Sequence, residues 1–152
     1  MAAELVGQGR IPGYDFVSYR HGPHVLHRIQ VVGPISRAER IPLYRRTLAL
    51  TDTGSYFCIL DNSAGHENDF TFDDMKFFGE LLRKAGIVAF YGATVTPDVG
   101  YAAVVSLASM IVEYSGMEGE LISTSSMAEA EAFIFDKMKD APVDQIPEQP
   151  GM

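Results

Sequence analysis

The hydrophobic pattern is clearest in residues 55–86, where an apolar run is followed by a polar loop and an amphipathic helix. Residues 56–60 read Tyr-Phe-Cys-Ile-Leu, a run too short for a buried helix and typical of a strand covered on both faces. Met75, Phe78 and Leu82 then recur at helical spacing. This order predicts half of a parallel α/β unit.

The same kinds of pattern predict the secondary structure of the rest of the chain. Strands are expected at residues 15–20, 25–32, 56–60, 87–93 and 120–123, and helices at residues 42–51, 72–85, 97–112 and 127–138. The fold class is therefore α/β, a single domain with a mixed sheet of about five strands and about four helices. Residues 1–13 are expected to be a flexible arm, residues 14–138 the domain, and residues 139–152 an acidic, proline-containing, disordered tail.

Two helices carry unusual signals. Ser36 and Glu39 have the spacing of a capping box, yet Pro42 lies too deep for a helix that begins at Ser36. The first helix is therefore predicted to begin at Pro42. The stretch Val99–Val112 has no charged residue, and a helix that is apolar all round must be covered on more than one side. The tail and neighbouring helices of the same chain, a second copy of the chain, or an apolar ligand would cover it.

Composition and charge exclude some classes of partner and location for this protein. The formal net charge of −8 argues against nucleic acid as the main partner, because phosphate binding needs clustered cations. The single cysteine, Cys58, lies within an apolar run and is expected to be a small buried side chain. The sequence has no recognisable signal peptide and no apolar stretch long enough to span a bilayer, so we expect a cytoplasmic protein without a membrane span.

In open α/β sheets, ligands bind beyond the carboxyl ends of the parallel strands. That rule selects polar or small residues that follow the two central strands, which we take as candidates for binding a ligand or partner: Asp61, Asn62, Ser63, His66, Gly92, Thr94 and Thr96. The alternative is that these residues cap and turn their own backbone, which is the interpretation we favour.

The sequence contains only weak indications of a catalytic or metal site. Asp61, Ser63 and His66 contain the residue types of a hydrolytic trio but lack a nucleophile-elbow motif. Asp61 and Thr94 resemble part of a phosphoreceiver site, but its acidic pair and lysine are missing. The histidines at 21, 24 and 27 have no adjacent cysteine or acid. We therefore predict no catalytic residue, no metal and no cofactor.

Four arginines cluster on and just before the first predicted helix: Arg37, Arg40, Arg45 and Arg46. They would either form a patch for a phosphate-bearing or acidic partner or lie on a solvated face. The solvated face is the favoured interpretation.

The order of elements, with two short segments, resembles the STAS domains, which include the anti-anti-sigma factors and the SpoIIAA-like proteins. Residues 57–65, Phe-Cys-Ile-Leu-Asp-Asn-Ser-Ala-Gly, are similar to the central strand and its exit. Residues 120–133 are similar to the last strand and its acidic, alanine-containing helix. The resemblance covers residues 15–138 by element order, and it implies the STAS fold and a regulatory role.

Regulatory STAS domains carry a phosphorylated serine in an Asp-Ser-Ser-Gly motif at the start of the helix after the central strand. In this chain residues 69–74 hold that place, and Thr71 is the only hydroxyl among them. Thr71 and Ser63 are thus the phosphorylation candidates. Two carboxylates follow Thr71, which would oppose an added phosphate.

These observations favour a non-catalytic regulatory or adaptor module that binds a protein partner. A homodimer through Val99–Val112 is one form of this hypothesis. A carrier of a small apolar or lipid-like ligand is the alternative, with a cavity walled by that helix and by four aromatics: Phe72, Phe77, Phe90 and Tyr91. A small hydrolase or phosphotransfer protein is the third possibility.

Overall fold

A computed structural model of the chain describes residues 3–97, 109–110, 112–113 and 115–143. The named elements, in chain order, are β1 (Glu4–Ile11), β2 (Tyr14–His21), β3 (His24–Val31), α1 (Arg37–Leu50), β4 (Ser55–Asp61), α2 (Phe72–Lys84), β5 (Ala89–Val95), β6 (Glu118–Thr124) and α4 (Met127–Asp140). Within these residues, no helix is both long enough and apolar enough to cross a membrane.

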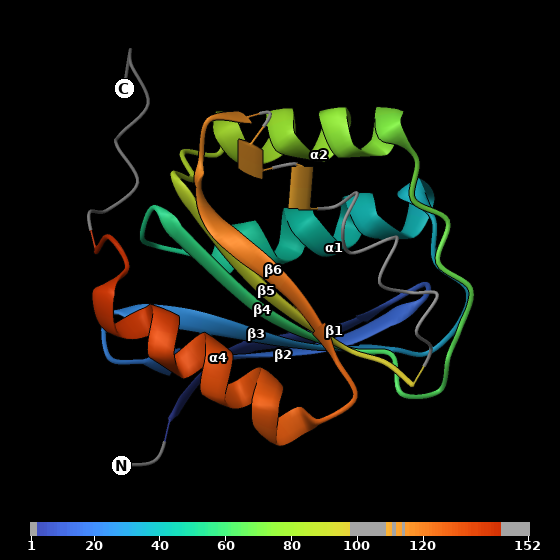
Figure 1. Cartoon of the computed structure of the whole chain (residues 1–152), viewed down its shortest axis with the longest axis horizontal. Coiled ribbons are helices and arrows are strands. Elements are labelled where there is room, and N and C mark those ends of the chain that lie inside the picture. Colours follow the sequence, from blue (N-terminus) through green and yellow to red (C-terminus); the bar gives the residue numbers. More distant parts are fainter. Residues whose placement is uncertain (1–2, 98–108, 111, 114, 144–152) are drawn as a thin grey trace.

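All six strands form one mixed sheet in the order β1-β2-β3-β4-β5-β6 (Figure 1). The first three strands are joined as an antiparallel meander, and β3 to β6 run parallel to one another. Phe57 of β4 pairs with Leu26 on one side and with Tyr91 on the other. The prediction that residues 56–60 form an interior strand is therefore confirmed.

The helices cover the two faces of the sheet unequally. Helices α1 and α2 lie on one face, over a core that includes Phe16, Tyr56 and Phe78. Helix α4 lies on the other face over β4, β5 and β6 (Figure 1), where Ala130 and Ile134 are fully buried. The general α/β class is confirmed, but the sheet has six strands instead of about five.

The additional strand is β1, in the segment that was expected to be a flexible arm. Its glycines lie directly under side chains of α1: a Cβ added to Gly7 would come within 2.6 Å of Leu50, and one added to Gly9 within 2.5 Å of Arg46. Glycines are common in loops, but Gly7 and Gly9 are positions of close helix–sheet approach. The hairpin of β2 and β3 therefore lies one strand inside the sheet edge.

The start of α1 also differs from the prediction. Ser36 is the N-cap in a capping box, with Glu39 accepting hydrogen bonds from the backbone N–H and the hydroxyl of Ser36. Arg40 N–H makes a helical bond to the Ser36 carbonyl, and Pro42 lies inside the helix. Pro42 is the sixth residue of α1, where it cannot donate to the Ala38 carbonyl and its ring crowds that carbonyl. The helix nevertheless begins at the capping box, so the prediction that it begins at Pro42 is wrong.

Helix α2 buries Met75, Phe78, Gly79 and Leu82, the face predicted from their spacing. Helix α4 extends past residue 138 to Asp140, and the chain stays packed as far as the Pro142 carbonyl, which accepts a hydrogen bond from Ser55 Oγ at 2.7 Å. The disordered tail is therefore not found at residues 139–143, and residues 144–152 lie outside the described part.

The described residues contain three named helices, α1, α2 and α4, whereas about four were predicted for the chain. Most of the predicted helix at Val99–Val112, with its role in a homodimer, lies outside the described residues. At its end, residues 109–110 and 112–113 are helical, and Val112 is buried.

Candidate functional site

The loop after β4 contains the first group of predicted site residues, and their polar atoms turn their own backbone. The buried Asn62 side chain donates to the His66 carbonyl at 3.1 Å and accepts from the His66 N–H at 2.9 Å. The Ser63 N–H and hydroxyl both donate to Asp61 Oδ1, at 3.0 and 2.5 Å. Four of the candidates thus lie together, in the bonding pattern of an Asx-type turn.

The geometry of this loop does not match a hydrolytic trio. A serine nucleophile must pass its proton to a histidine that an acid orients. Here the Ser63 hydroxyl is directed at a carboxylate, and the bonds of His66 to the loop run through its backbone. The arrangement closes a turn and does not activate a hydroxyl.

Thr71 begins α2 as its N-cap. Its hydroxyl accepts the Asp74 N–H at 3.1 Å, and the Asp74 carboxylate accepts the Thr71 N–H at 3.0 Å. Arg37 Nε donates to the other Asp74 oxygen at 2.5 Å. Burial opposes ionisation of Asp74, but the bonds from Thr71 and Arg37 outweigh it and lower the pKa of the carboxyl. Whether Thr71 or Ser63 is phosphorylated stays a prediction.

Two of the three candidates assigned to the end of the next strand, Gly92 and Thr94, are not in a loop. Strand β5 runs to Val95, two residues past its predicted end, so Gly92 and Thr94 lie within it. Gly92 pairs with Cys58 and Leu121, and Thr94 pairs with Leu60 and Ser123. Thr96 is buried next to the strand end, and its N–H donates to the Thr124 carbonyl at 2.9 Å. Gly92 therefore lies away from the carboxyl edge of the sheet.

The arginine cluster does not form one patch. Arg40 is only 5% exposed; it donates to the Asp69 carbonyl at 2.6 Å and to the Asn68 side chain, and it lies over the ring of Phe70. Arg46 lies over Phe16, and Arg45 is exposed. With Arg37 on Asp74, three of the four guanidinium groups attach α1 to other segments. Neither the phosphate patch nor a fully solvated face describes them.

The three histidines of β2 and β3 do not converge on a metal. His21 packs edge-on against Phe135 of α4, whereas His27 is buried on the α1 side between Ser18 Oγ and Thr51 Oγ1, each at 2.7 Å. Burial lowers the pKa of His27 to about 3. Burial also raises the pKa of the Cys58 thiol to about 12, as expected of a small core side chain.

The four aromatics proposed to wall an apolar cavity lie apart. Phe72 and Phe77 are 49% and 38% exposed on α2. Phe90 packs in the core beneath α1 and α2, whereas Tyr91 packs against the cluster beneath α4, on the opposite face of the sheet. They cannot line one cavity, so this form of the carrier hypothesis is wrong. Strand alternation is the reason, because Phe90 and Tyr91 are consecutive in β5.

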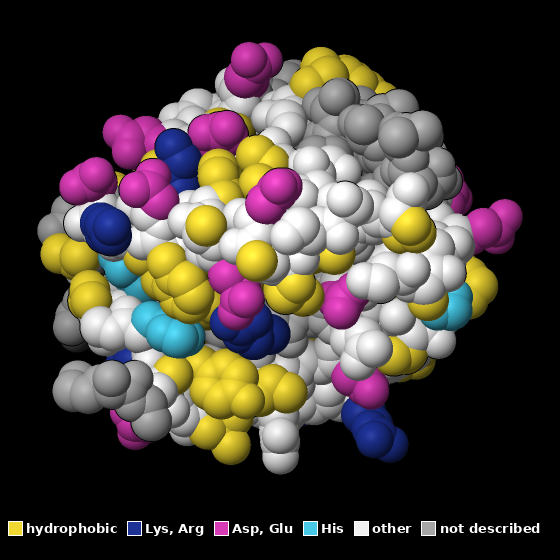
Figure 2. All heavy atoms as spheres, turned by 60° about the horizontal axis from the view of Figure 1, so that its bottom comes forward, with side chains coloured by type: hydrophobic (Ala, Val, Ile, Leu, Met, Phe, Trp, Pro, Cys, Tyr) yellow, Lys and Arg dark blue, Asp and Glu magenta, His cyan; other side chains and the backbone are white. Residues whose placement is uncertain are grey.

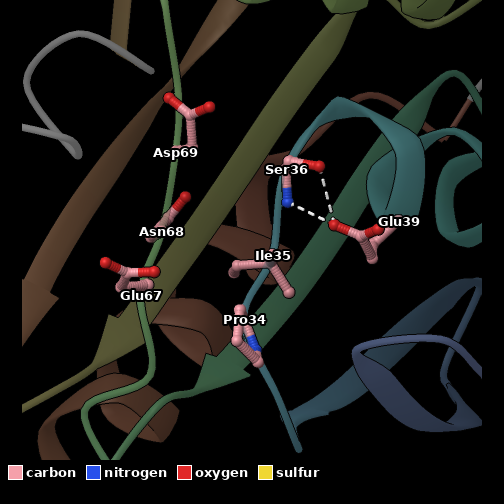
Figure 3. A pocket seen from close by; sticks show the side chains of 7 residues that line it. All are labelled: Pro34, Ile35, Ser36, Glu39, Glu67, Asn68 and Asp69. Atoms are coloured by element: carbon pink, nitrogen blue, oxygen red, sulfur yellow. Dashed lines mark hydrogen bonds between the residues drawn. The ribbon is translucent and has the colours of Figure 1, made fainter.

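A hollow of about 620 Å³ lies where the segment before α1 passes the segment before α2 (Figure 3). Ile35 joins the two segments: its N–H donates to the Glu67 carbonyl and its carbonyl accepts the Asp69 N–H, both at 2.9 Å. Figure 3 shows Glu39 turned back onto Ser36, while Glu67 and Asp69 project from the other segment. The hollow is acidic, and its wall is held by backbone bonds.

A separate groove of about 520 Å³ follows the outer side of α2. We call it the α2 groove; it is lined by Arg37, Asp73, Lys76, Phe77, Glu80, Leu81 and Lys84. Arg37 lies over the Phe77 ring at 5.1 Å, and Lys76 lies over the Phe72 ring at 5.7 Å. Phe77 was expected to wall a ligand cavity but lies at the surface. Its position two residues after the buried Met75, facing away from the core stripe, was the available signal of exposure.

Comparison of the chain with models of known protein families, with curated proteins and with solved structures yields no match in any of the three.

Proposed function

We propose that the chain is a STAS-like, non-catalytic regulatory or adaptor module that binds a protein partner along the α2 groove. The observation that carries the proposal is the pair of aromatic side chains, Phe72 and Phe77, held at the surface of one helix. Large exposed aromatics set among charged residues are typical anchors of protein interfaces.

The surroundings of Phe77 support a protein partner. The α2 groove carries cations and carboxylates on one helix face, with Leu81 beside the ring. Arg37 stacks on Phe77 while Asp74 holds its Nε, so the aromatic and the guanidinium are already ordered before a partner arrives. Preordered side chains lower the entropy lost on association.

The polar residues at the carboxyl edge of the sheet support a role without catalysis. Asp61, Asn62, Ser63 and Thr71 are engaged in turns and a helix cap. A rigid edge of this kind positions the start of α2, and with it the two exposed aromatics.

Site-specific photo-crosslinking in the source cells tests the proposal. A photoreactive residue in place of Lys76, in the groove, should yield a discrete protein adduct, whereas the same residue in place of the exposed Arg45 on α1 should not. Adding Phe77→Ala to the Lys76 variant should abolish the adduct. Equal labelling from both positions, or an adduct that survives Phe77→Ala, would contradict docking at this groove.

A further inference from the structure

The face of the sheet that carries α4 is only partly covered. Helix α4 packs on β4, β5 and β6. Side chains of β1 and β2, with Arg28 and Gln30 at the end of β3, stay at least partly exposed beside it. Figure 2 shows hydrophobic side chains on this side of the molecule interrupted by histidine, basic and acidic groups. A hollow of about 250 Å³ lies here, next to Met127 at the start of α4. An adjoining hollow of about 410 Å³ shares Asp15 and Val17 with it.

The strand register brings charges of both signs into the smaller hollow. One row across the sheet pairs Asp15 with Gln30 and Gln30 with Asp61. The neighbouring row pairs Val17 with Arg28 and Arg28 with Ile59. All six residues line the hollow.

The regular spacing of strands in a sheet gives the approximate Cα–Cα distances between these residues. With strands about 4.8 Å apart, the two aspartates are about 10 Å apart at their Cα atoms, with Gln30 between them. Arg28 is two positions from Gln30 on the same face, about 7 Å away. Asp15 and Asp61 thus lie on either side of Gln30, and Arg28 lies two positions before Gln30 on the same strand.

Contacts with neighbouring residues hold these charged groups, and each contact occupies only part of the hydrogen-bonding capacity of the group. Arg28 donates from one terminal nitrogen to Glu131 of α4 at 2.6 Å, with both side chains about one-third exposed. A guanidinium has further donors in the same plane. Asp61 is oriented through Oδ1 by Ser63. Asp15 lies 3.8 Å from the highly exposed Arg10, a contact of little energy.

We propose that this hollow binds a small zwitterion of amino-acid size, with its ammonium group between Asp15 and Asp61 and its carboxylate on Arg28. A simple anion would meet two carboxylates and a simple cation would meet Arg28, whereas a zwitterion satisfies both signs. Val17 and Ile59 provide an apolar floor for a side chain. This site lies on the opposite face of the sheet from the α2 groove and is independent of the proposed function.

An amide-resolved NMR titration of the whole chain with each of the twenty common amino acids tests the site. At least one should shift the amide signals around residues 15–17, 28–30 and 59–61 and saturate at millimolar concentration. Its methyl ester, which lacks the carboxylate, and its N-acetyl derivative, which lacks the ammonium, should each bind about tenfold or more weakly. No saturable binding by any of the twenty, or equal binding of both derivatives, would overturn the proposal.

Matched variants assign the two charges. Arg28→Gln and Asp61→Asn should each weaken binding about tenfold. Glu131→Gln breaks the same ion pair but keeps Arg28, and Ser63→Ala keeps the Asp61 carboxylate, so both should bind. Loss of binding in the controls alone would overturn the assignment. If Arg28→Gln does not fold, the comparison of the ester and the N-acetyl derivative on the wild-type chain decides the question.

Discussion

Arg37 Nε donates to Asp74 Oδ1 at 2.5 Å, which joins the first turn of α1 to the first turn of α2. The Asp74 side chain is 7% exposed, and its second oxygen accepts the Thr71 N–H. One buried carboxylate therefore links the two helices on the same face of the sheet and positions the start of the α2 groove.

Replacing Asp74 by Asn should lower the free energy of unfolding by about 1–3 kcal/mol, because a buried charged acceptor loses its pairing with Arg37. The exposed neighbour Asp73 is the matched control, and Asp73→Asn should change stability by less than about 0.5 kcal/mol. Urea denaturation of both variants measures the difference. Equal midpoints would contradict the structural role of Asp74.

The Thr71 hydroxyl caps α2 by accepting the Asp74 N–H. Thr71→Ala should therefore destabilise the chain by about 1 kcal/mol, whereas Thr71→Ser, which keeps the acceptor, should stay close to wild type. Thermal unfolding followed by circular dichroism measures both. If Ser and Ala are equally destabilising, the loss comes from the methyl group and not from the cap.

The buried His27 should make stability depend on pH. Thr51 Oγ1 donates to the Thr47 carbonyl, so it accepts from His27 Nε2–H, and His27 Nδ1 accepts from Ser18. The folded state thus holds a neutral ring, with its pKa lowered by burial to about 3, whereas the unfolded chain protonates near the ordinary value of 6.5. The stabilisation is complete above about pH 6.5 and falls by about 1.4 kcal/mol per pH unit as the pH drops toward 3.

His27→Gln isolates that contribution. Burial also lowers the pKa values of His21 and His24, so their titration acts in the same direction and remains in the variant. Between pH 6 and pH 4, the unfolding free energy of His27→Gln should fall less steeply than that of the wild type, by about 1.4 kcal/mol per pH unit. Parallel pH profiles would show that His27 is protonated in the folded state.

Gly119 in β6 has φ +145°, and a Cβ added there would lie 1.9 Å from the Phe90 carbonyl oxygen of β5. Gly119→Ala should therefore cost about 3 kcal/mol or more, because backbone has to move. At Gly22, φ is +60° and the space is open, so Gly22→Ala should cost about 1 kcal/mol. Denaturant midpoints compare the two; a milder effect at Gly119 would contradict the packing of β6 on β5.

The interior strand and the buried face of α2 could be predicted from sequence, because both leave strong local patterns. Residues 56–60 form a continuous apolar run, and Met75, Phe78 and Leu82 recur at helical spacing. Strand β1 could not be predicted, because two glycines in a short segment are typical of a loop. Only the folded chain shows that Leu50 and Arg46 lie directly over Gly7 and Gly9. That information lies about 40 residues away along the chain.

The position of the polar loop after β4 could be predicted from the sequence. The interpretation that its side chains turn their own backbone is confirmed by the bonds of Asn62 and Asp61. The exposure of Phe72 and Phe77 contradicts the prediction that they wall a cavity. Their aromatic character favoured a cavity, although both lie off the buried stripe of α2. Which face of the sheet an aromatic occupies depends on strand register, as the opposite placement of Phe90 and Tyr91 illustrates.

We propose that a protein partner docks on the α2 groove through Phe77. Isothermal titration of the partner captured at position 76 against the purified chain measures this docking. Phe77→Ala should raise the Kd about tenfold or more, while Leu5→Ala, which truncates a similarly exposed apolar side chain on β1, should leave the Kd unchanged. A wild-type Kd for Phe77→Ala would contradict the claim.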